Sequence, residues 1–519
     1  MRKLKIIPVL LLLLACQKTT KEKAQMNEET LYRPLIHFTP KAHWMNDPNG
    51  MFYFNGKYHL YFQYYPGASV WGPMHWGHAS SKDLIHWEEH PIALYPDEMG
   101  YIFSGSAVVD HKNTSGFGKD GKTPIVAIFT HHDMDKEIAE KIDVETQSIA
   151  FSLDEGMTWT KYEGNPVIEN PAIRDFRDPK VFWDDEREQW VLILAAQQKV
   201  MLYTSPNLKD WTFSAHFGEK VGHHGGVWEC PDLFPLPVNQ GEEQKWVMLV
   251  SINPGGPNGG SATQYFIGDF DGKRFSLDPE FAAQLDNDNN YWVDFGRDNY
   301  AGVTWQNKTL DNGNKLFIGW MSNWQYAKVV PTEKWRSAMT VARELSLKHN
   351  ENGYRLFSKI ASQFNEVTGK KTQLENQNLG AKHKIIYENL AGLGALKLSF
   401  ELNLEKEQSF EFQFKNDLGS HLDIGLDSTN NYFYIDRTAS GAVDFEKEFG
   451  SRVSIAPRLG NEKILTGELI IDKTSIEVFW DGGRTVMTDI FFPTAPYTQI
   501  AVKGDNEIQI KQGKVTHLK

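Results

Sequence analysis

The sequence predicts an all-β protein in which a β-propeller is followed by a β-sandwich. From about Leu31 to Leu347, short runs of alternating apolar and aromatic residues are separated by Gly, Pro, Asn and Asp, with little helical periodicity. Within this part a turn motif recurs, and after it a second series of alternating strands begins. These three observations are typical of two successive β-domains.

The recurring motif indicates the blades of the propeller. Each copy combines a Ser, an Asp or Asn and a Trp, and follows a strand-like run. The copies are "SSKDLIHWEEH" (80–90), "SLDEGMTWTKY" (152–162), "SPNLKDWTFSA" (205–215) and, more weakly, "DFDGKRFSLD" (269–278). Self-similarity at intervals of roughly 50 to 70 residues is what propeller blades leave in a sequence. Four or five blades would fill residues 31–350, whereas unrelated hairpins would not share both the turn and the Trp.

The composition changes after the propeller. Residues 348–378 are mostly polar and predict a linker, placed at 351–370, with room for one short helix. Strands then return over 371–519, as in "ALKLSFELNL" and "SFEFQFKN", and alternate with period two, which is typical of an antiparallel sandwich with one solvent-exposed face. This half carries no cluster of His, Asp and Glu in rigid turns, so we expect a structural or sugar-contacting role.

Length and charge limit the class of partner. A chain of 519 residues is long enough for two domains. Its net charge of -13 argues against nucleic acid or an acidic polymer, since both would be repelled, and favours a neutral ligand. Aromatic residues make up 13% of the chain, which suits β-sheet cores and the stacking faces of sugars.

The N-terminus predicts a processing and anchoring signal. "MRKLK" is a positive n-region, "IIPVLLLLLA" is a short apolar region, and "LLAC" places Cys16 where bacterial lipoproteins are cut and acylated. Residues 1–16 are therefore interpreted as a lipoprotein signal peptide and the polar residues 17–30 as a flexible tether. The alternative is an ordinary cleaved signal with an incidental Cys. The lipobox predicts a cell-envelope lipoprotein in the outer membrane and leaves the leaflet open.

Only Cys230 remains after Cys16, so the mature chain can form no intrachain disulfide. Cys230 has no neighbouring His that would make it a nucleophile, and we interpret it as buried packing beside Glu229.

Three acidic residues in the first domain have unusual settings. Asp47 lies in "WMNDPNG", Asp178 in "FRDPKVFW" and Glu229 in "WECPDLF", each near a Pro and at or near the start of a strand-like run. For Asp47 the Asn-Asp-Pro-Asn-Gly run predicts a rigid turn before a hairpin. Because the inner strands of a propeller begin near its central channel, acids at this position on different blades would converge.

Converging carboxylates are the catalytic groups that glycoside hydrolases use. One, ionised, attacks the anomeric carbon, and another, protonated, delivers a proton to the leaving oxygen. We expect Arg177 to keep its neighbour Asp178 ionised. The alternatives are a local structural ion pair for Arg177 and Asp178, and for Glu229 a buried acid satisfied by backbone groups.

Four ordered blocks closely resemble the hallmark motifs of glycoside hydrolase family 32, the invertases, inulinases and levanases: "WMNDPNG" (44–50), "FSGS" (103–106), "FRDP" (176–179) and "ECP" (229–231). "WGPMHWGHASSKDLIHWE" (71–88) and "WRSAMTVARELSL" (335–347) look similar as well. The resemblance covers nearly all of the chain from about Leu31. It implies a five-bladed propeller carrying a β-sandwich.

The resemblance also implies roles for individual residues. Asp47 would be the nucleophile, Glu229 the general acid/base, and Asp178 the acid that binds fructose hydroxyls and stabilises the transition state. The reaction would be a retaining double displacement. The residues matching family positions that line the fructose pocket are Asn46, Gln63, Trp71, Ser104 and Arg177.

Neither a metal nor another cofactor is expected. The pairs His75 and His78, His131 and His132, and His223 and His224 lack structural-zinc spacing, and the proposed chemistry needs no metal. "NPGGPNGGS" (253–261) does not fit the phosphate-binding P-loop pattern and is interpreted as a loop.

The leading hypothesis is a lipid-anchored β-fructosidase acting on a fructan, levan or inulin, rather than on sucrose alone. "ECPDLF" (229–234) and the uninterrupted "WMNDPNG" favour exo action, and an endo-levanase at the cell surface is the runner-up. A non-catalytic fructan-binding propeller is the alternative of another class, although all three acids are present. Arabinan hydrolysis by another five-bladed family is a third alternative, against which the "NDPNG" and "ECP" blocks argue.

Overall fold

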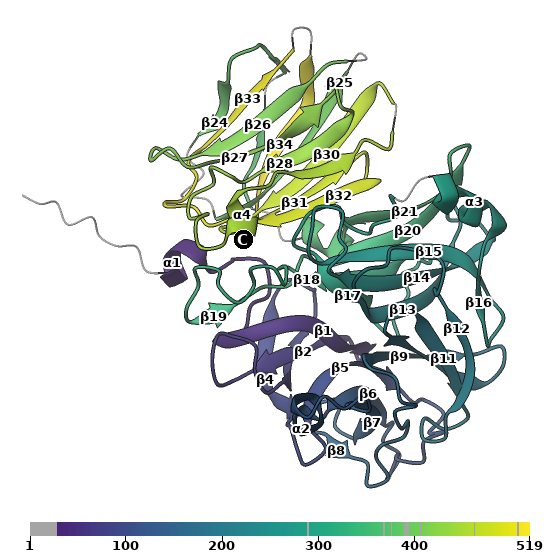
Figure 1. Ribbon diagram of the computed structural model, residues 1–519. Coiled ribbons are helices and arrows are strands. Elements are labelled where there is room, and N and C mark those ends of the chain that lie inside the picture. The colour runs from purple at the N-terminus through teal and green to yellow at the C-terminus, as the bar shows by residue number, and fades with distance from the viewer. Residues whose placement is uncertain are drawn as a thin grey trace, which may run out of the picture.

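The computed structural model describes residues 28–518 except 288–289, 367–368, 375, 389–393, 405–406, 461 and 506–507. It consists of two β-domains in contact, with the propeller below the sandwich in Figure 1. The all-β prediction, with a five-bladed propeller followed by a sandwich, is confirmed. The predicted signal peptide with Cys16, and the tether up to residue 27, lie outside the described residues.

Each of the first four blades is a sheet whose strands follow one another in the chain. Blade I contains β1 (His43–Phe54), β2 (Lys57–Tyr65), β3 (His75–Ser81) and β4 (Trp87–Leu94). Blade II contains β5 (Tyr101–Val109), β6 (Ile125–His132), β7 (Glu145–Ser152) and β8 (Thr160–Lys161). Blade III contains β9 (Phe176–Asp184), β10 (Gln189–Ala196), β11 (Val200–Ser205) and β12 (Thr212–Phe217). Blade IV contains β13 (Val227–Pro237), β14 (Gln244–Asn253), β15 (Ala262–Phe270) and β16 (Phe275–Leu277).

Blade V contains β17 (Tyr300–Thr304), β18 (Lys315–Trp320), β20 (Arg343–Asn350) and β21 (Gly353–Ile360). The short strand β19 (Trp335–Arg336) instead pairs in parallel with β1 of blade I. The inner strands β1, β5, β9, β13 and β17 contact one another in this order, and β17 contacts β1, so the ring is closed. The radial repetition of blades leaves only short, protected strand edges around the channel.

The recurring sequence motif marks the same turn in four blades, the one between the third and fourth strands. In the first three copies a Ser hydroxyl accepts a hydrogen bond from the backbone N–H two residues further on, as Ser81 does from Asp83, Ser152 from Asp154 and Ser205 from Asn207. Such Ser turns are local and sequence-encoded, which is why the repeat was visible in the sequence.

Two sequence-based boundaries are wrong in part. Residues 353–360 of the predicted linker form β21, which pairs along its whole length with β20, because its alternating apolar side chains complete the fifth blade. Residues 28–30 of the predicted tether belong to the helix α1 (Glu28–Tyr32), which is held to the domain where Glu28 Oε1 accepts a hydrogen bond from the Glu333 N–H. The other described helices are α2 (Met134–Ile138), α3 (Pro279–Asn287), α4 (Lys447–Gly450) and the 3-10 turn η1 (Ser362–Asn365).

The sandwich packs two antiparallel sheets face to face. One sheet contains β22 (Lys371–Gln373), β34 (Gln509–Leu518), β25 (Ala395–Asn403), β30 (Ile464–Ile471), β31 (Ser475–Trp480) and β32 (Thr485–Ile490), with β23 (Gln377–Asn378) also paired to β34. The other contains β24 (Lys384–Glu388), β33 (Gln499–Gly504), β26 (Phe410–Lys415), β27 (His421–Asp427), β28 (Tyr432–Asp436) and β29 (Ser454–Pro457). Aromatic rings fill the space between them, for example Phe433 stacked on Trp480 at 4.5 Å.

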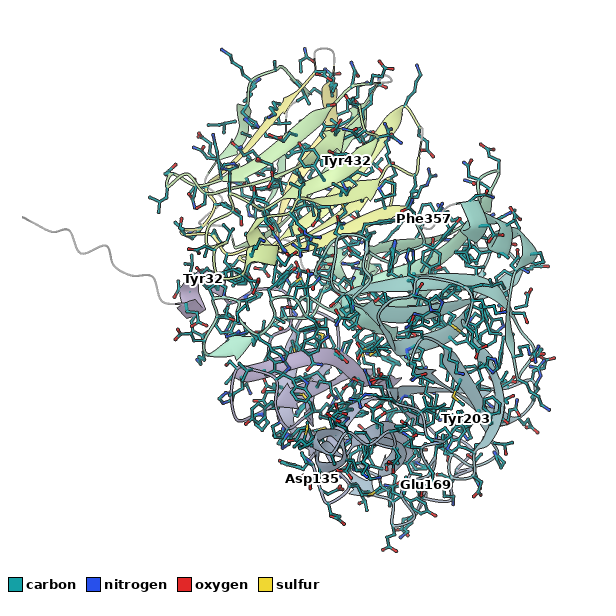
Figure 2. All side chains as sticks on the ribbon, in the orientation of Figure 1. Tyr32, Asp135, Glu169, Tyr203, Phe357 and Tyr432 are labelled. Atoms are coloured by element: carbon teal, nitrogen blue, oxygen red, sulfur yellow. The ribbon has the colours of Figure 1, made fainter. Side chains whose placement is uncertain are left out.

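Buried charges join the two domains. Arg343 of blade V is fully buried, and its guanidinium donates hydrogen bonds to Asp294 Oδ2 at 2.8 Å within the propeller and to Glu477 Oε2 of the sandwich (3.0 Å from Nε). Where blade V faces the sandwich, Phe357 lies under Arg484 at 5.6 Å (Figure 2). Removing one partner of such a buried pair costs several kcal/mol, about 3–5, so the domains are firmly coupled. Among the residues described, no helix is long and apolar enough to cross a bilayer.

Candidate active site

A pocket of about 410 Å³ opens at the end of the channel where the inner strands begin. All eight residues predicted for the catalytic centre and its fructose pocket line it: Asn46, Asp47, Gln63, Trp71, Ser104, Arg177, Asp178 and Glu229. The structure therefore brings together segments that are up to about 180 residues apart in the sequence. The volume is within the range of about 300–1,000 Å³ found for small-ligand sites.

Every inner strand carries a β-bulge near this end, where two of its residues oppose one residue of the next strand. The pairs are Asn46 and Asp47 opposite Gln63, Phe103 and Ser104 opposite Thr130, Asp178 and Pro179 opposite Leu194, Cys230 and Pro231 opposite Val250, and Ala301 and Gly302 opposite Gly319. A bulge bends the strand and changes the direction of its side chains. In this way four of the five inner strands direct a pocket-lining side chain towards the channel.

The bulges correct the sequence-based interpretation of Asp47. We expected a rigid turn at 46–50, but these residues lie inside the continuous strand β1. Pro48 is tolerated there because the bulge interrupts the ladder, and Gly50 adopts a φ of +52° at a second register shift. Residues that favour turns also favour bulges, so the composition of residues 46–50 does not distinguish a turn from a bulge.

The carboxylate of Asp47 is oriented by side chains from two blades. Its Oδ1 accepts a hydrogen bond from Asn46 Nδ2 at 3.0 Å, and its Oδ2 accepts one from Ser104 Oγ at 2.7 Å. Asn46 is itself held because Trp44 Nε1 donates to its Oδ1 at 2.7 Å. A nucleophile needs this kind of fixed orientation.

Glu229 is surrounded by donors. Arg177 Nη2 donates to Glu229 Oε1 at 3.0 Å, and the Tyr300 hydroxyl donates to Glu229 Oε2. Burial and the nearby Asp47 nevertheless raise the pKa of Glu229, and the donors only partly offset this. A carboxyl with a raised pKa is suited to donate a proton at neutral pH.

The ion pairs of Arg177 do not support the alternative of a local pair with Asp178. The guanidinium of Arg177 donates instead to Glu229, Glu145 and Asp175. Burial, Glu229 and Asp47 outweigh the Coulombic effect of Arg177 and raise the pKa of Asp178 to about 8. The expectation that Arg177 keeps Asp178 ionised is wrong, because desolvation of the Asp178 carboxyl is the larger effect.

Cys230 lies between the carboxylates. Its backbone N–H donates to Asp178 Oδ2 at 2.9 Å, and its Sγ lies 3.5 Å from Asp47 Oδ2 and 3.6 Å from Asp178 Oδ2. Its φ is +45°, a strained value for a residue with a side chain. Burial and the three acids raise the pKa of the thiol well above its usual value, so the group is not a thiolate nucleophile.

Three further residues of the site could not be predicted as functional from the sequence. Tyr300 opens the inner strand of blade V. Glu145 is buried, and its carboxylate joins Arg177 to His132, whose Nδ1 lies 3.2 Å from Glu145 Oε1. No local motif surrounds Tyr300 or Glu145; only proximity in the fold identifies them. His132 belongs to a pair of adjacent histidines, and in the sequence such a pair suggests only a metal ligand.

Aromatic rings form the wall of the pocket. Trp71 packs edge-on against Tyr101 and Phe103, at 6.4 and 6.1 Å between ring centroids. Trp324 also lines the pocket and stacks on Trp44 at 5.7 Å. Apolar walls with a few oriented polar groups are typical of sugar-binding pockets.

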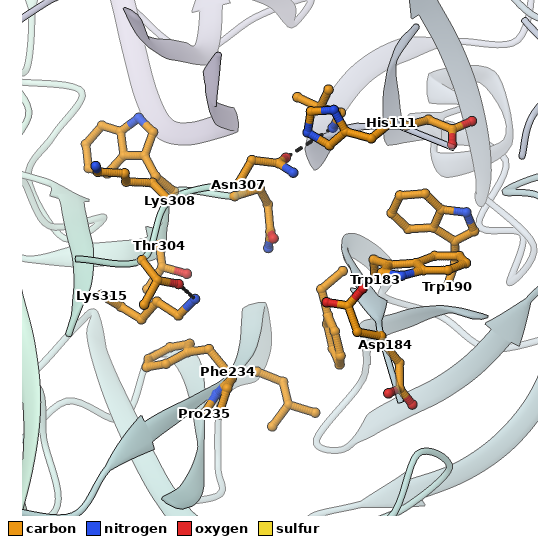
Figure 3. Close-up of a pocket in the computed structure, with 18 of the residues that line it drawn as sticks. His111, Trp183, Asp184, Trp190, Phe234, Pro235, Thr304, Asn307, Lys308 and Lys315 are labelled. Atoms are coloured by element: carbon orange, nitrogen blue, oxygen red, sulfur yellow. Dashed lines mark hydrogen bonds between the residues drawn. The ribbon is translucent and has the colours of Figure 1, made fainter. Parts of the chain in front are cut away.

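A second, larger hollow of about 590 Å³ lies at the opposite end of the channel, where the inner strands end (Figure 3). Its lining includes Trp183, Trp190, Asn307 and Lys315, but none of the three catalytic candidates. Between the two ends, the buried Lys180 Nζ lies 3.1 Å from Asp232 Oδ2 and donates to the Thr304 carbonyl. Lys180 and Asp232 thus lie in the channel between the two hollows, which share no lining residue.

Three carboxylates from three blades, gathered in one pocket with aromatic walls, define a glycoside hydrolase. Comparison of the chain with protein-family models agrees. The model described as "Glycosyl hydrolases family 32 N-terminal domain" matches residues 37–359, and the family's C-terminal model matches residues 357–517. The chain belongs to glycoside hydrolase family 32.

Individual relatives are similar over most of the chain. A levanase of Bacillus subtilis (strain 168) is 44% identical over 490 residues, which cover 94% of this chain and 70% of the relative. The crystal structure of exo-inulinase from Aspergillus awamori matches with a TM-score of 0.84 and 35% identity, covering 95% of this chain and 99% of the other. A fructofuranosidase variant from Schwanniomyces occidentalis, complexed with fructosylnystose, matches with a TM-score of 0.82 and 35% identity, covering 95% and 98%.

Proposed function

We propose that this protein is a retaining, exo-acting β-fructosidase that removes terminal β-D-fructofuranosyl units from a fructan, levan or inulin. The single observation that carries this proposal is the convergence of Asp47, Asp178 and Glu229 on one pocket at the end of the channel. The blocks "ECPDLF" (229–234) and "WMNDPNG" (44–50) favour exo action. Relatives named levanase and exo-inulinase support the substrate class.

The residues take the following roles. The Asp47 carboxylate attacks the anomeric carbon of the terminal fructose, while Glu229 protonates the leaving glycosidic oxygen. Glu229 then accepts a proton from water, which hydrolyses the fructosyl ester on Asp47. Asp178 binds fructose hydroxyls, and Trp71 provides an apolar face for the ring.

Substrate binding would place the proton where the first step needs it. The pKa values of both Asp178 and Glu229 are raised, and the two acids are close enough to affect each other. When fructose binds, its hydroxyl groups donate hydrogen bonds to Asp178 and so favour the ionised form of this acid. The proton then resides on Glu229, beside the leaving oxygen.

A neighbouring hollow supports a polymeric substrate. It measures about 740 Å³, shares Asp175 with the catalytic pocket, and is lined by residues 196–199, 224–227 and 253–254 together with Glu219. The chain beyond the cleaved bond can extend into this space, which sucrose would leave unused.

The test is a time course with protein lacking residues 1–27, incubated separately with levan, inulin, sucrose and arabinan. Fructose alone from the first minutes supports exo action, and the better polymer identifies the linkage. A ladder of oligosaccharides would overturn exo action in favour of an endo-fructanase, for which the neighbouring hollow leaves room. Binding without products would indicate a lectin, and arabinose released from arabinan would indicate the third alternative. Asp47→Asn and Glu229→Gln are the matched inactive controls.

We further propose that the protein is a cell-envelope lipoprotein anchored through Cys16, in the outer membrane, where it meets polymer. The lipobox "LLAC" supports this. Incorporation of a labelled fatty acid into the wild-type chain, and its loss together with release from the membrane fraction in Cys16→Ser, is the expected result. An unlabelled wild-type chain would contradict the anchor.

A further inference from the structure

The outer, solvent-facing side of one sandwich sheet carries a hollow of about 560 Å³. It lies over β26, β27 and β28, in the upper domain of Figure 1. Its lining includes the tyrosines Tyr432, labelled in Figure 2, and Tyr434. The catalytic residues lie in the other domain, so this hollow is not part of the catalytic pocket.

Tyr434 lies flat on the sheet. Glu411, Gly425 and Tyr434 are direct cross-strand partners in one row over β26, β27 and β28. Neighbouring strands are about 4.8 Å apart, yet the Tyr434 hydroxyl crosses β27 and donates to Glu411 Oε2 at 2.7 Å. A Cβ on Gly425 would lie only 2.8 Å from Tyr434 Oη and 3.0 Å from Cζ. The glycine therefore provides the space in which the ring lies, with its other face towards the hollow.

The ring is held in this position from its far end. Glu411 Oε1 accepts hydrogen bonds from His383 Nε2 at 2.8 Å and from Lys503 Nζ at 2.9 Å, so the acceptor of the Tyr434 hydroxyl is fixed on three sides. A side chain already held in its binding position loses little entropy when a ligand stacks on it.

We propose that this hollow is a carbohydrate-binding site that holds the fructan substrate by stacking a sugar ring on Tyr434. The proposal rests on the proposed function for the identity of the polymer. Ser409 and Asp427 at the edge of the hollow can hydrogen-bond to sugar hydroxyls. Asp427, Asp436 and Asp505 make the surroundings acidic, so a neutral polysaccharide is accepted and an anionic one is repelled.

The hollow is connected to the catalytic side of the propeller by one loop. Ile455 of β29 borders it, and the Ile455 carbonyl accepts a hydrogen bond from Asn258 Nδ2 at 2.8 Å. Asn258 belongs to the loop 253–261, whose first residues, Asn253 and Pro254, line the hollow beside the catalytic pocket. A long chain held on the sandwich can thus reach the catalytic pocket along this side, and local concentration would favour its cleavage.

The test is affinity electrophoresis of the full chain lacking residues 1–27, in gels containing levan or inulin. Glu229→Gln is used as the background so that the polymer is not degraded. Adding Tyr434→Ala is expected to weaken retention about tenfold, as loss of a central aromatic contact does. Tyr434→Phe keeps the ring without its anchor and should give a smaller loss. Phe213→Ala, an exposed aromatic on the outer strand of blade III, is the matched control and should change nothing.

Unchanged retention in both Tyr434 variants would overturn the proposal. In the active enzyme, Tyr434→Ala should lower kcat/KM on polymer and leave it unchanged on a fructan trisaccharide, and the trisaccharide rate also shows that the variant is folded. Equal losses on both substrates would overturn the proposal as well. If the wild type hydrolyses no fructan, the proposed function fails separately, and Tyr434-dependent retention in gels of other neutral polysaccharides would still support the site.

Discussion

The hydroxyl of Tyr300, on blade V, donates a hydrogen bond to Oε2 of Glu229, on blade IV. This bond favours the ionised form of Glu229 and so opposes the effect of burial, which raises its pKa. The tyrosine therefore limits how strongly the acid holds its proton, and it acts on a different carboxylate oxygen from Arg177, the other donor to Glu229.

Tyr300→Phe is expected to raise the pKa of Glu229 further, since it removes a hydrogen bond that favours the ionised carboxylate. Because Glu229 acts in its protonated form in the first step, the alkaline limb of the kcat/KM profile should move to higher pH. The measurement is a pH–rate profile from pH 4 to 10. Tyr387→Phe, which removes a sandwich hydroxyl bonded to His517, is the control and should leave the limb in place. A limb that moves to lower pH would contradict this role of Tyr300.

The roles of Asp47 and Glu229 can be separated by the leaving group. Glu229→Gln should lower kcat/KM on sucrose by about 10²–10⁴-fold, but far less on an aryl β-fructofuranoside, whose leaving group needs no protonation. Asp47→Asn should reduce both rates to a similar extent, because the nucleophile is required whatever the leaving group. If instead Asp47→Asn spared the aryl substrate and Glu229→Gln reduced both rates, Glu229 would be the nucleophile and Asp47 the acid.

Cys230 should be unreactive in the folded enzyme. It is 4% exposed, and burial together with the nearby acids raises its pKa well above the usual value. Protein lacking residues 1–27 should therefore show no alkylation by iodoacetamide at pH 8 by mass spectrometry, and one modification after unfolding in guanidinium. Rapid alkylation of the native protein, with loss of activity, would show that the thiol is accessible from the pocket.

The contact between domains should weaken at alkaline pH through His37. Burial disfavours its charged form, but hydrogen bonds from its Nδ1 to Asp472 and from its Nε2 to Glu477, both at 2.9 Å, outweigh this and raise its pKa to about 9. The resulting stabilisation is fully present below about pH 6.5 and is lost as pH rises through about 9, an effect of about 3 kcal/mol in the unfolding free energy. Urea unfolding at pH 6, 8 and 10 measures it. His37→Gln should flatten this dependence, and an equally steep dependence in that variant would assign it to other groups.

Much of the site could be predicted because its parts are local motifs. Asp47, Ser104, Asp178 and Glu229 each lie in a short block of Pro, Gly and aromatic residues, and the blades are marked by Ser turns whose hydrogen bonds span two residues. Such signals depend on neighbours in the chain, so one sequence suffices to find them.

What could not be predicted depends on residues that meet only in the fold. Glu145 and Tyr300 have no distinctive sequence context, yet both contact groups of the pocket. The protonation of Asp178 depends on burial and on two acids from other blades, which a neighbouring Arg177 does not reveal. The bulge at Asp47 is a shift in the pairing register between β1 and β2. The sequence of one strand does not show how that strand pairs with its neighbour, so the bulge could not be predicted.

The bulges place one surplus residue in each inner strand at the mouth of the channel. Deleting that residue from a single strand would restore an uninterrupted ladder and turn the side chains on one side of the deletion to the opposite face of the blade. For β1, β9 or β13 the shortened blade would be the more regular one, and its acid would no longer point as it does now. In this propeller the irregular positions of the inner strands are thus the ones that set the direction of the catalytic acids.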